Sequence, residues 1–270
     1  MKIGLLGDMH GQEQWINRAI DEFEKQGLDT IIQVGDLGVW PGNVASAMWD
    51  RVNKRLRLAG ITILCTPGNH EDYDQIEALE PREDRWLPFR EHILLAPRGH
   101  RTEMGGRTFV WLGGAASVDR KQRLIADSAF NKQREHYGSS NRRKTWWEQE
   151  AITDTDVART AAGGRADVMV AHDAPSRVQT IASRLRGNPG GFSQHDIDYA
   201  NQVRAKYMEA FVAVEPTVAL HGHYHFAVSE SVDYGAFTTH VFGLANDGQP
   251  YSTGVLDLDT LEPAFTGWQQ

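Results

Sequence analysis

The sequence has only one cysteine, Cys65, among its 270 residues. An intrachain disulfide is therefore excluded, which fits a reducing compartment. No uninterrupted apolar run approaches the roughly 20 residues that a membrane-spanning helix needs. The apolar start of the chain is broken at Asp8, too early for a signal peptide. We therefore expect a cytoplasmic protein that does not act at a membrane.

The sequence also lacks an excess of basic residues. Its 28 Lys and Arg stand against 36 Asp and Glu, a formal net charge of -8. This charge disfavours nucleic acid as a partner and makes site chemistry the better explanation for the 11 histidines. With 40% hydrophobic and 24% charged residues the composition is ordinary for a globular protein. We predict a single domain over residues 1–270, of undetermined oligomeric state.

Short apolar runs alternate with helical patterns at the start of the chain. Ile3–Leu6, Thr30–Val34 and Ile61–Cys65 are predicted strands, with helices around residues 15–23 and 44–58 between them. This order predicts parallel strands joined by right-handed crossovers. The later elements are expected to be a hairpin over residues 100–112, strands at 168–171 and 217–220, a helix around 195–212 and an antiparallel finish between 226 and 258.

Polar motifs follow five of the predicted strands. In open α/β sheets, ligands bind outside the carboxyl ends of the strands. We therefore expect these motifs to surround one crevice, although they are far apart in the sequence. They are Asp8-Met9-His10, Gly35-Asp36, Gly68-Asn69-His70-Glu71, Ala171-His172-Asp173 and Gly222-His223-Tyr224-His225.

The motifs supply a mixed set of nitrogen and oxygen donors without a thiolate. Such a set suits Mn, Fe, Zn or Ni, and Mg is a further alternative; we expect Mn²⁺ because its availability often decides occupancy. One tetrahedral ion needs fewer ligands than are present, so two divalent ions are predicted. Their charge, only half offset by two carboxylates, would attract a phosphate and acidify a bridging water. The seven candidate ligands are Asp8, His10, Asp36, Asn69, His172, His223 and His225.

The ordered pattern D-x-H, G-D, G-N-H with a following acidic residue, a lone H and G-H-x-H resembles that of the calcineurin-like metallophosphoesterases. The resemblance implies an α/β fold, a four-layer αββα sandwich with mixed sheets. It implies that Asp36 bridges two ions and that His70 is a catalytic non-ligand, which protonates the leaving oxygen or stabilises developing charge. A metal-bridging hydroxide would attack phosphorus. The remaining ligands would divide into Asp8, His10 and His225 for one ion and Asn69, His172 and His223 for the other.

One departure from the superfamily bears on the substrate. The Ser/Thr protein phosphatases continue the second motif with Asp-Arg-Gly, whereas here Asp36 is followed by Leu37 and Gly38. This favours the smaller bacterial and phage members, several of which hydrolyse cyclic nucleotides or other phosphodiesters. We expect a phosphodiesterase acting on a small, cyclic nucleotide. A phosphomonoesterase or nuclease of the same family stays open, and a non-catalytic metal-binding scaffold is the alternative from another class.

The stretch 117–149 is long and basic. Its eight Lys and Arg against four Asp and Glu give +4 within a chain of net -8. A solvated surface loop is one interpretation. We favour an insert that caps the metal crevice, because long insertions in enzymes are often functional. Arg120 and Arg123 are the predicted substrate contacts, since arginine can grip phosphate with two hydrogen bonds.

Overall fold

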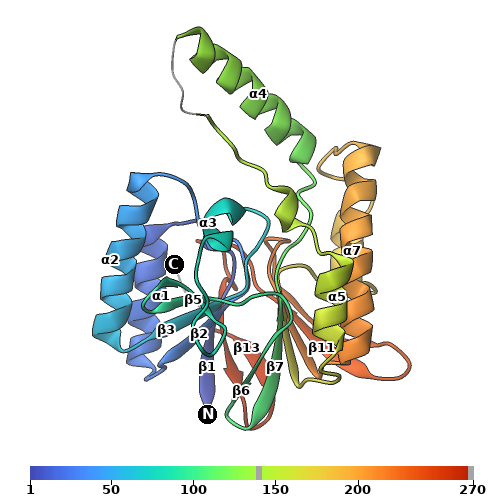
Figure 1. The fold of residues 1–270 in the computed structure, drawn as a ribbon. Coiled ribbons are helices and arrows are strands. Elements are labelled where there is room, and N and C mark those ends of the chain that lie inside the picture. The colour runs from blue at the N-terminus through green and yellow to red at the C-terminus, as the bar shows by residue number, and fades with distance from the viewer. Residues whose placement is uncertain (138–141, 267–270) are drawn as a thin grey trace.

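The structure is a computed structural model that describes residues 1–137 and 142–266. Two β-sheets stack face to face, and helices cover the outer face of each (Figure 1). This arrangement confirms the predicted four-layer αββα sandwich.

The first sheet has seven strands among the described residues, in the order β13-β12-β1-β2-β3-β5-β4. Its central strands β1, β2, β3 and β5 run parallel, while β12, β13 and β4 pair antiparallel with their neighbours. The parallel opening of the chain is thus confirmed. The strand bounds are Lys2–Leu6 (β1), Thr30–Gln33 (β2), Thr62–Cys65 (β3), Leu87–Arg90 (β4), Ile93–Leu95 (β5), Thr253–Asp257 (β12) and Glu262–Phe265 (β13).

The second sheet has six strands in the described part of the chain, in the order β10-β11-β9-β8-β7-β6. The predicted hairpin is confirmed as β6 and β7, and β7, β8, β9 and β11 run parallel. The antiparallel finish is confirmed for β10 with β11 and for β12 with β13, but it is wrong for β11, which runs parallel to β9. The bounds are His100–Met104 (β6), Arg107–Leu112 (β7), Val168–Ala171 (β8), Val218–His221 (β9), Val228–Asp233 (β10) and Thr238–Gly243 (β11).

Amphipathic helices form the two outer layers. In α1 (Glu13–Lys25) the buried residues Trp15, Ile16, Ala19, Ile20 and Phe23 recur at helical spacing and face the first sheet. The helix α2 (Asn43–Ala59) packs beside α1, and α5 (Asp154–Ala161) packs with α7 (Gln194–Val214) on the second sheet. Within the described residues, no helix combines the length and apolar character needed to cross a membrane. The short helices are α3 (Tyr73–Glu77), α6 (Gln179–Leu185) and the 3-10 turn η1 (Glu148–Glu150).

The main core lies between the two sheets. Because side chains alternate along a strand, Ile3 and Leu5 of β1 face this inner core, whereas Leu6 faces the helices. Trp111 of β7 and Leu220 of β9 meet them from the second sheet. Full burial of each such aliphatic side chain contributes about 1.5–3 kcal/mol. The rigid core fixes the strand ends from which the polar motifs project.

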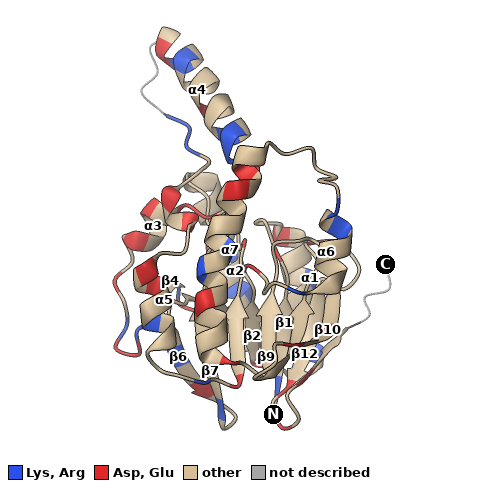
Figure 2. Ribbon diagram, turned by 90° about the vertical axis from the view of Figure 1, so that its right-hand side faces the viewer, with Lys and Arg blue, Asp and Glu red and all other residues tan. Residues whose placement is uncertain are grey.

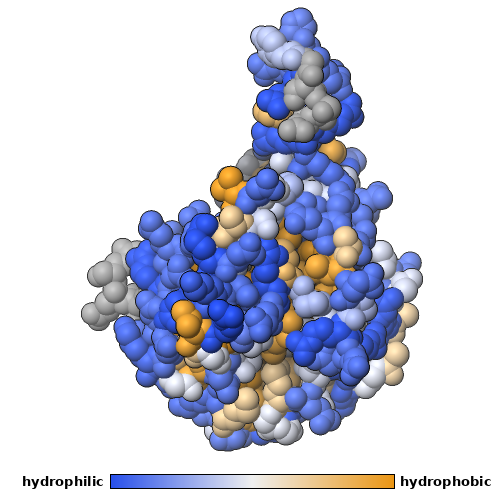
Figure 3. Space-filling model, turned by 60° about the vertical axis from the view of Figure 1, so that its left-hand side comes forward, coloured by the Kyte–Doolittle hydropathy of each residue, from blue (hydrophilic) through white to orange (hydrophobic). Residues whose placement is uncertain are grey.

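One segment stands away from this body. We call residues 117–137 and 142–149 the arm; it contains the helix α4 (Arg120–His136), which points away from the sheets (Figure 1). In the space-filling view the arm is a narrow projection with a mostly hydrophilic surface (Figure 3). The interpretation of this stretch as a loop is therefore wrong for α4. The prediction that the arm caps the metal crevice stays a prediction.

Candidate metal centre

The carboxyl ends of parallel strands from both sheets meet at one edge of the sandwich. The first sheet supplies three motifs, after β1, β2 and β3, and the second supplies two, after β8 and β9. All seven predicted ligands converge there in two overlapping groups, and His70 lies beside them.

The first group consists of Asp8, His10, Asp36 and His225. One donor atom from each lies within 4.8 Å of the others. The Nε2 atom of His225 is 3.2 Å from Oδ2 of Asp8, and Nε2 of His10 is 3.6 Å from Oδ2 of Asp36. Four donors at this separation are enough to surround a single cation.

The second group consists of Asn69, His172 and His223. The amide oxygen Oδ1 of Asn69 is 3.0 Å from Nε2 of His172 and 2.9 Å from Nδ1 of His223. His172 Nε2 is also 3.3 Å from Oδ1 of Asp36. Asp36 therefore turns one carboxylate oxygen toward each group, which is the arrangement that a bridging ligand requires.

The charges of the site fit two divalent ions. Asp8 and Asp36 are buried, and within the described residues their only ion-pair partners are histidines. Burial lowers the pKa of His10 and His172, but nearby carboxylates, chiefly that of Asp36, outweigh it and raise their pKa values to about 9 and about 10. Burial lowers the pKa of His223 to about 4, so this imidazole keeps a lone pair for coordination. The protonated imidazoles of His10 and His172 thus balance the charge of the buried carboxylates Asp8 and Asp36, a role that bound cations would take over.

The backbone around the ligands is strained. Among the described residues, ten non-glycine residues have a positive φ, and four of them are predicted ligands: His10 at 43°, Asp36 at 54°, His223 at 67° and His225 at 58°. This left-handed conformation costs of order 1–3 kcal/mol for each residue and persists only where the surroundings enforce it. The strained turns therefore lower the stability of the fold but orient these side chains toward a common point.

Two glycines let the motifs approach one another. A Cβ atom on Gly222 would lie 2.0 Å from Oδ1 of Asp8, and one on Gly35 would lie 2.2 Å from Nδ1 of His172. Gly35 also has a φ of 106°, which a residue with a side chain rarely adopts. The glycines next to the ligands are thus required by close contacts with ligands from other motifs.

His70 lies next to the ligand groups. Its backbone N–H donates to Oδ1 of Asp36 at 2.8 Å, and its ring meets that of His10 edge-on at 5.7 Å. Burial lowers its pKa and Asp36 opposes this change, while Arg123 lowers the pKa further. The position agrees with a non-ligand beside the reacting phosphate, and that role stays a prediction.

Arg123 reaches the same point from the base of α4. Its Nη2 atom is 2.9 Å from Nδ1 of His70, its Nε atom pairs with Asp119 at 2.8 Å, and its Nη1 atom donates to the carbonyl of Thr145 at 3.1 Å. These partners hold a largely buried guanidinium at the edge of the site. Of the two predicted substrate contacts, Arg123 is therefore the one that the structure places there.

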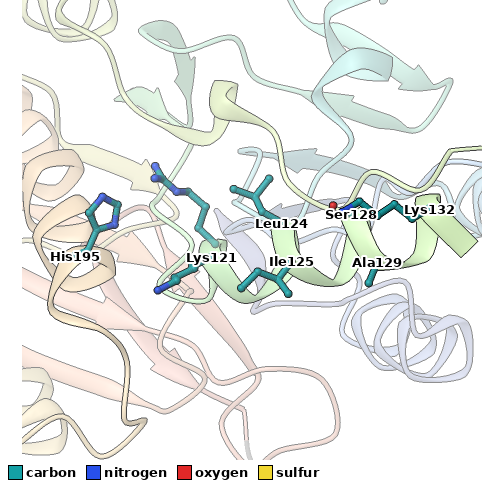
Figure 4. A pocket seen from close by; sticks show the side chains of 8 residues that line it. Lys121, Leu124, Ile125, Ser128, Ala129, Lys132 and His195 are labelled. Carbon is teal, nitrogen blue, oxygen red and sulfur yellow. The ribbon is translucent and has the colours of Figure 1, made fainter.

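Arg120 lies among aromatic rings instead. Its guanidinium is 4.4 Å from the ring centre of Tyr199 and 5.2 Å from that of Trp146. It borders a hollow of about 790 Å³ beside α4 (Figure 4), which no predicted ligand lines. A substrate contact by Arg120 stays a prediction. The lining residues are Arg120, Lys121, Leu124, Ile125, Ser128, Ala129 and Lys132 of α4 and His195 of α7.

Several residues that support the ligands carry no recognisable motif. Oδ1 of Asp247 lies 3.0 Å from Nδ1 of His10, and the carbonyl of Val34 lies 2.8 Å from Nδ1 of His172. Such partners fix which ring nitrogen faces the ion. Asp247 comes from the loop after β11, and nothing in its sequence neighbourhood distinguishes it from other surface acids.

Glu71 holds the loop that follows Asp36. Its buried carboxylate accepts hydrogen bonds from the backbone N–H groups of Leu37 at 2.6 Å and Val39 at 2.7 Å. Burial raises its pKa to about 7, against these hydrogen bonds. The acidic residue of the third motif therefore shapes the second motif rather than orienting a histidine.

Comparison with known proteins identifies the family of the chain. The family described as calcineurin-like phosphoesterase matches residues 1–227. No curated protein matches the chain. Among solved structures, the protein TT1561 of Thermus thermophilus is 13% identical, with 98% of both chains covered and a TM-score of 0.51, which supports the same fold.

Two further solved structures resemble the chain at lower TM-scores. A novel archaeal phosphodiesterase is 15% identical over 99% of this chain and 100% of its own, with a TM-score of 0.44. A dimetal phosphatase from Danio rerio is 10% identical over 94% and 91%, with a TM-score of 0.47.

Proposed function

Because the chain belongs to the calcineurin-like phosphoesterase family, we propose that it is a phosphodiesterase that uses two manganese ions to hydrolyse a small, cyclic nucleotide. Family membership supports metal-dependent hydrolysis of phosphoesters. The proposal adds that the substrate is a diester, that it is a cyclic nucleotide and that the metal is manganese. The observation that carries it is the pair of ligand groups joined through Asp36, with His70 alongside.

The seven predicted ligands would hold the two ions. Asp36 would contribute to both ions. When bound, the two ions supply the positive charge that attracts a phosphate and acidifies an attacking water. The other six residues would divide into Asp8, His10 and His225 for one ion and Asn69, His172 and His223 for the other.

Side chains of the protein would complete the reaction. His70 stands outside the ligand groups, and its ring, which the Arg123 guanidinium contacts, would carry a proton to the departing oxygen. A nucleoside oxygen is a poor leaving group, and this proton transfer helps such a group most. The Arg123 guanidinium, in contact with the His70 ring, would hydrogen-bond a non-bridging phosphate oxygen.

The charge distribution supports a small substrate. The arm carries +4 of a total of -8, so the rest of the chain carries -12. A long polyanion approaching this body is repelled, whereas a compact anion enters the site without covering the surface. The basic residues of α4 and of the segment that returns from it (Figure 2) are the one feature that favours a nuclease.

A substrate panel tests the proposal. The protein is stripped with a chelator, reloaded with Mn, Fe, Zn, Ni or Mg, and assayed on bis-p-nitrophenyl phosphate. It is then compared on a nucleoside monophosphate, on 2′,3′- and 3′,5′-cyclic nucleotides and on single-stranded DNA, with Asp36→Asn as the inactive control. We expect the manganese form to prefer a cyclic nucleotide and chelation to abolish turnover.

Other results would redirect the assignment. A preference for the monophosphate would make the protein a phosphomonoesterase, and a preference for DNA would make it a nuclease. If the protein bound metal but turned over no ester with any of the ions, the scaffold alternative would replace the proposal.

A further inference from the structure

The two ends of the arm meet beside a predicted ligand. Ser117 begins the arm and Glu150 directly follows it, and both are buried. The backbone N–H of Ser117 donates to Oε1 of Glu150 at 2.8 Å, and its hydroxyl donates to Oε2 at 2.6 Å. On the other side, Nδ2 of Asn69 donates to the Ser117 hydroxyl oxygen at 2.9 Å.

The direction of these hydrogen bonds follows from the donor and acceptor types. An ionised carboxylate only accepts, so the Ser117 hydroxyl must give its proton to Glu150. Its lone pairs are then left to accept from an N–H group of Asn69. The two ends of the Asn69 amide have nearly the same shape, so the network decides which end points where. Here it turns Oδ1 toward His172 and His223.

Glu150 is itself held from two other sides. The hydroxyl of Tyr199 donates to its Oε1 atom at 3.0 Å. Arg98 donates to the carbonyls of the flanking residues Gln149 at 2.6 Å and Ala151 at 2.8 Å. The carboxylate therefore has a fixed position, although it has no part in the proposed chemistry.

We propose that Ser117 and Glu150 are positioning residues that set the polarity of the Asn69 amide, so that its oxygen faces the second ion. This inference rests on the proposed function. A reversed amide would direct its NH₂ group at the cation and remove one ligand. The site for the second ion thus includes both ends of the arm, in addition to the residues of the five motifs.

The isosteric variant Glu150→Gln is the central test. Its amide nitrogen would donate to the Ser117 oxygen and free the hydroxyl proton, which then has the amide oxygen of Asn69 as an acceptor. Reversal of the Asn69 amide should lower the affinity for the second ion by about tenfold or more. This is the usual effect of losing a partner that orients a ligand. The first ion should bind as in the wild type. Calorimetric titration with Mn²⁺ and the spin-coupled signal of a manganese pair measure both ions without relying on turnover.

Three further variants make the test specific. Ser117→Ala removes the hydroxyl oxygen that accepts from the Asn69 amide, and it should also lower the affinity for the second ion. Tyr199→Phe removes a donor to the same carboxylate but leaves Ser117 and Asn69 unchanged, so it should bind two ions like the wild type. The double variant Asn69→Asp, Glu150→Gln should recover the second ion, because a carboxylate at position 69 offers an oxygen in either orientation.

The outcomes separate the two proposals. Two ions bound equally by the wild type, Glu150→Gln and Ser117→Ala would overturn the positioning role and leave the proposed function standing. A wild type that binds two ions but hydrolyses no ester would overturn the function alone. If Glu150→Gln fails to fold, as judged by circular dichroism, Ser117→Ala and Tyr199→Phe decide: weaker binding of the second ion by the first and wild-type binding of two ions by the second support the inference, and any other pair of results refutes it.

Discussion

Metal loading should release protons, because the metal-free site holds protons in place of ions. With pKa values of about 9 and about 10, His10 and His172 are both charged at pH 7.5 and compensate the carboxylates of Asp8 and Asp36. As ligands, both imidazoles must be neutral. We therefore expect about two protons to be released for each protein that takes up two ions, one from each histidine.

The same exchange sets the pH dependence of metal affinity. While both imidazoles are protonated, the product of the two dissociation constants should fall about 100-fold for each unit rise in pH, and this slope should fade near pH 9. The metal-free protein should show the opposite trend. Because both pKa values are raised above the ordinary value of about 6.5, their contribution to stability is full below that pH and is lost as the pH rises through about 9 and about 10.

Calorimetric titration with Mn²⁺ in buffers of different ionisation enthalpy counts the released protons, and thermal unfolding of the chelated protein follows the stability. Asp259→Asn is a matched control, since this acid pairs with the N-terminal amine at the opposite end of the molecule from the arm (Figure 1). It should release as many protons as the wild type. Release of fewer than one proton per protein would refute the claim that Asp36 holds two protonated imidazoles.

The other predictions concern single side chains of the site. His70→Ala should keep two ions but slow hydrolysis of diesters with poor leaving groups by about 10²–10⁴, with a smaller effect on p-nitrophenyl esters; an equal loss of metal would instead make His70 a ligand. Arg123→Gln should lower kcat/KM by about 10- to 100-fold at unchanged metal content, and an unchanged kcat/KM would exclude contact with the phosphate. Gly222→Ala should displace the Asp8 carboxylate, which lies 2.0 Å from the added Cβ, and lose the first ion in metal analysis; a variant that retains both ions would show that the turn can yield.

The convergence of the seven predicted ligands could be expected from the sequence because each of them closely follows a strand. The strands before Asp8, Asp36 and His172 are short and mostly apolar, although Gln33 interrupts the run before Asp36, so the strand ends are visible in the sequence. Parallel pairing then brings such ends to one edge without knowledge of any side-chain contact. The turn residues add to this signal, since glycine beside a ligand marks a close approach.

The supporting residues could not be predicted because their roles exist only in the folded chain. In the sequence, Glu150 resembles any other acidic residue of a polar stretch. Its proposed positioning role depends on its hydrogen bond from Ser117, which in turn accepts from Asn69. Asp247 likewise acquires its partner His10 from the far end of the sequence. A residue with no local pattern and a single distant contact leaves no trace in periodicity or motif spacing.

The helix α4 was missed for a different reason. A helix is recognised by an apolar stripe that packs on a core, but Leu124 and Ile125 are exposed on α4, at 43% and 61%, and Asp127 is its one buried residue. The strand pair β4 and β5 was missed as well, because both are short and Pro88 interrupts the pattern. Both failures arise where structure forms with little apolar burial.

The division of the ligands between two sheets has a consequence for the ribosome-bound chain. The first four ligands are made before residue 70, yet His172, His223 and His225 follow more than a hundred residues later. The first sheet itself is completed by β12 and β13, close to the end of the sequence. A growing polypeptide therefore cannot assemble the predicted ion sites on a finished sandwich until translation has passed β13.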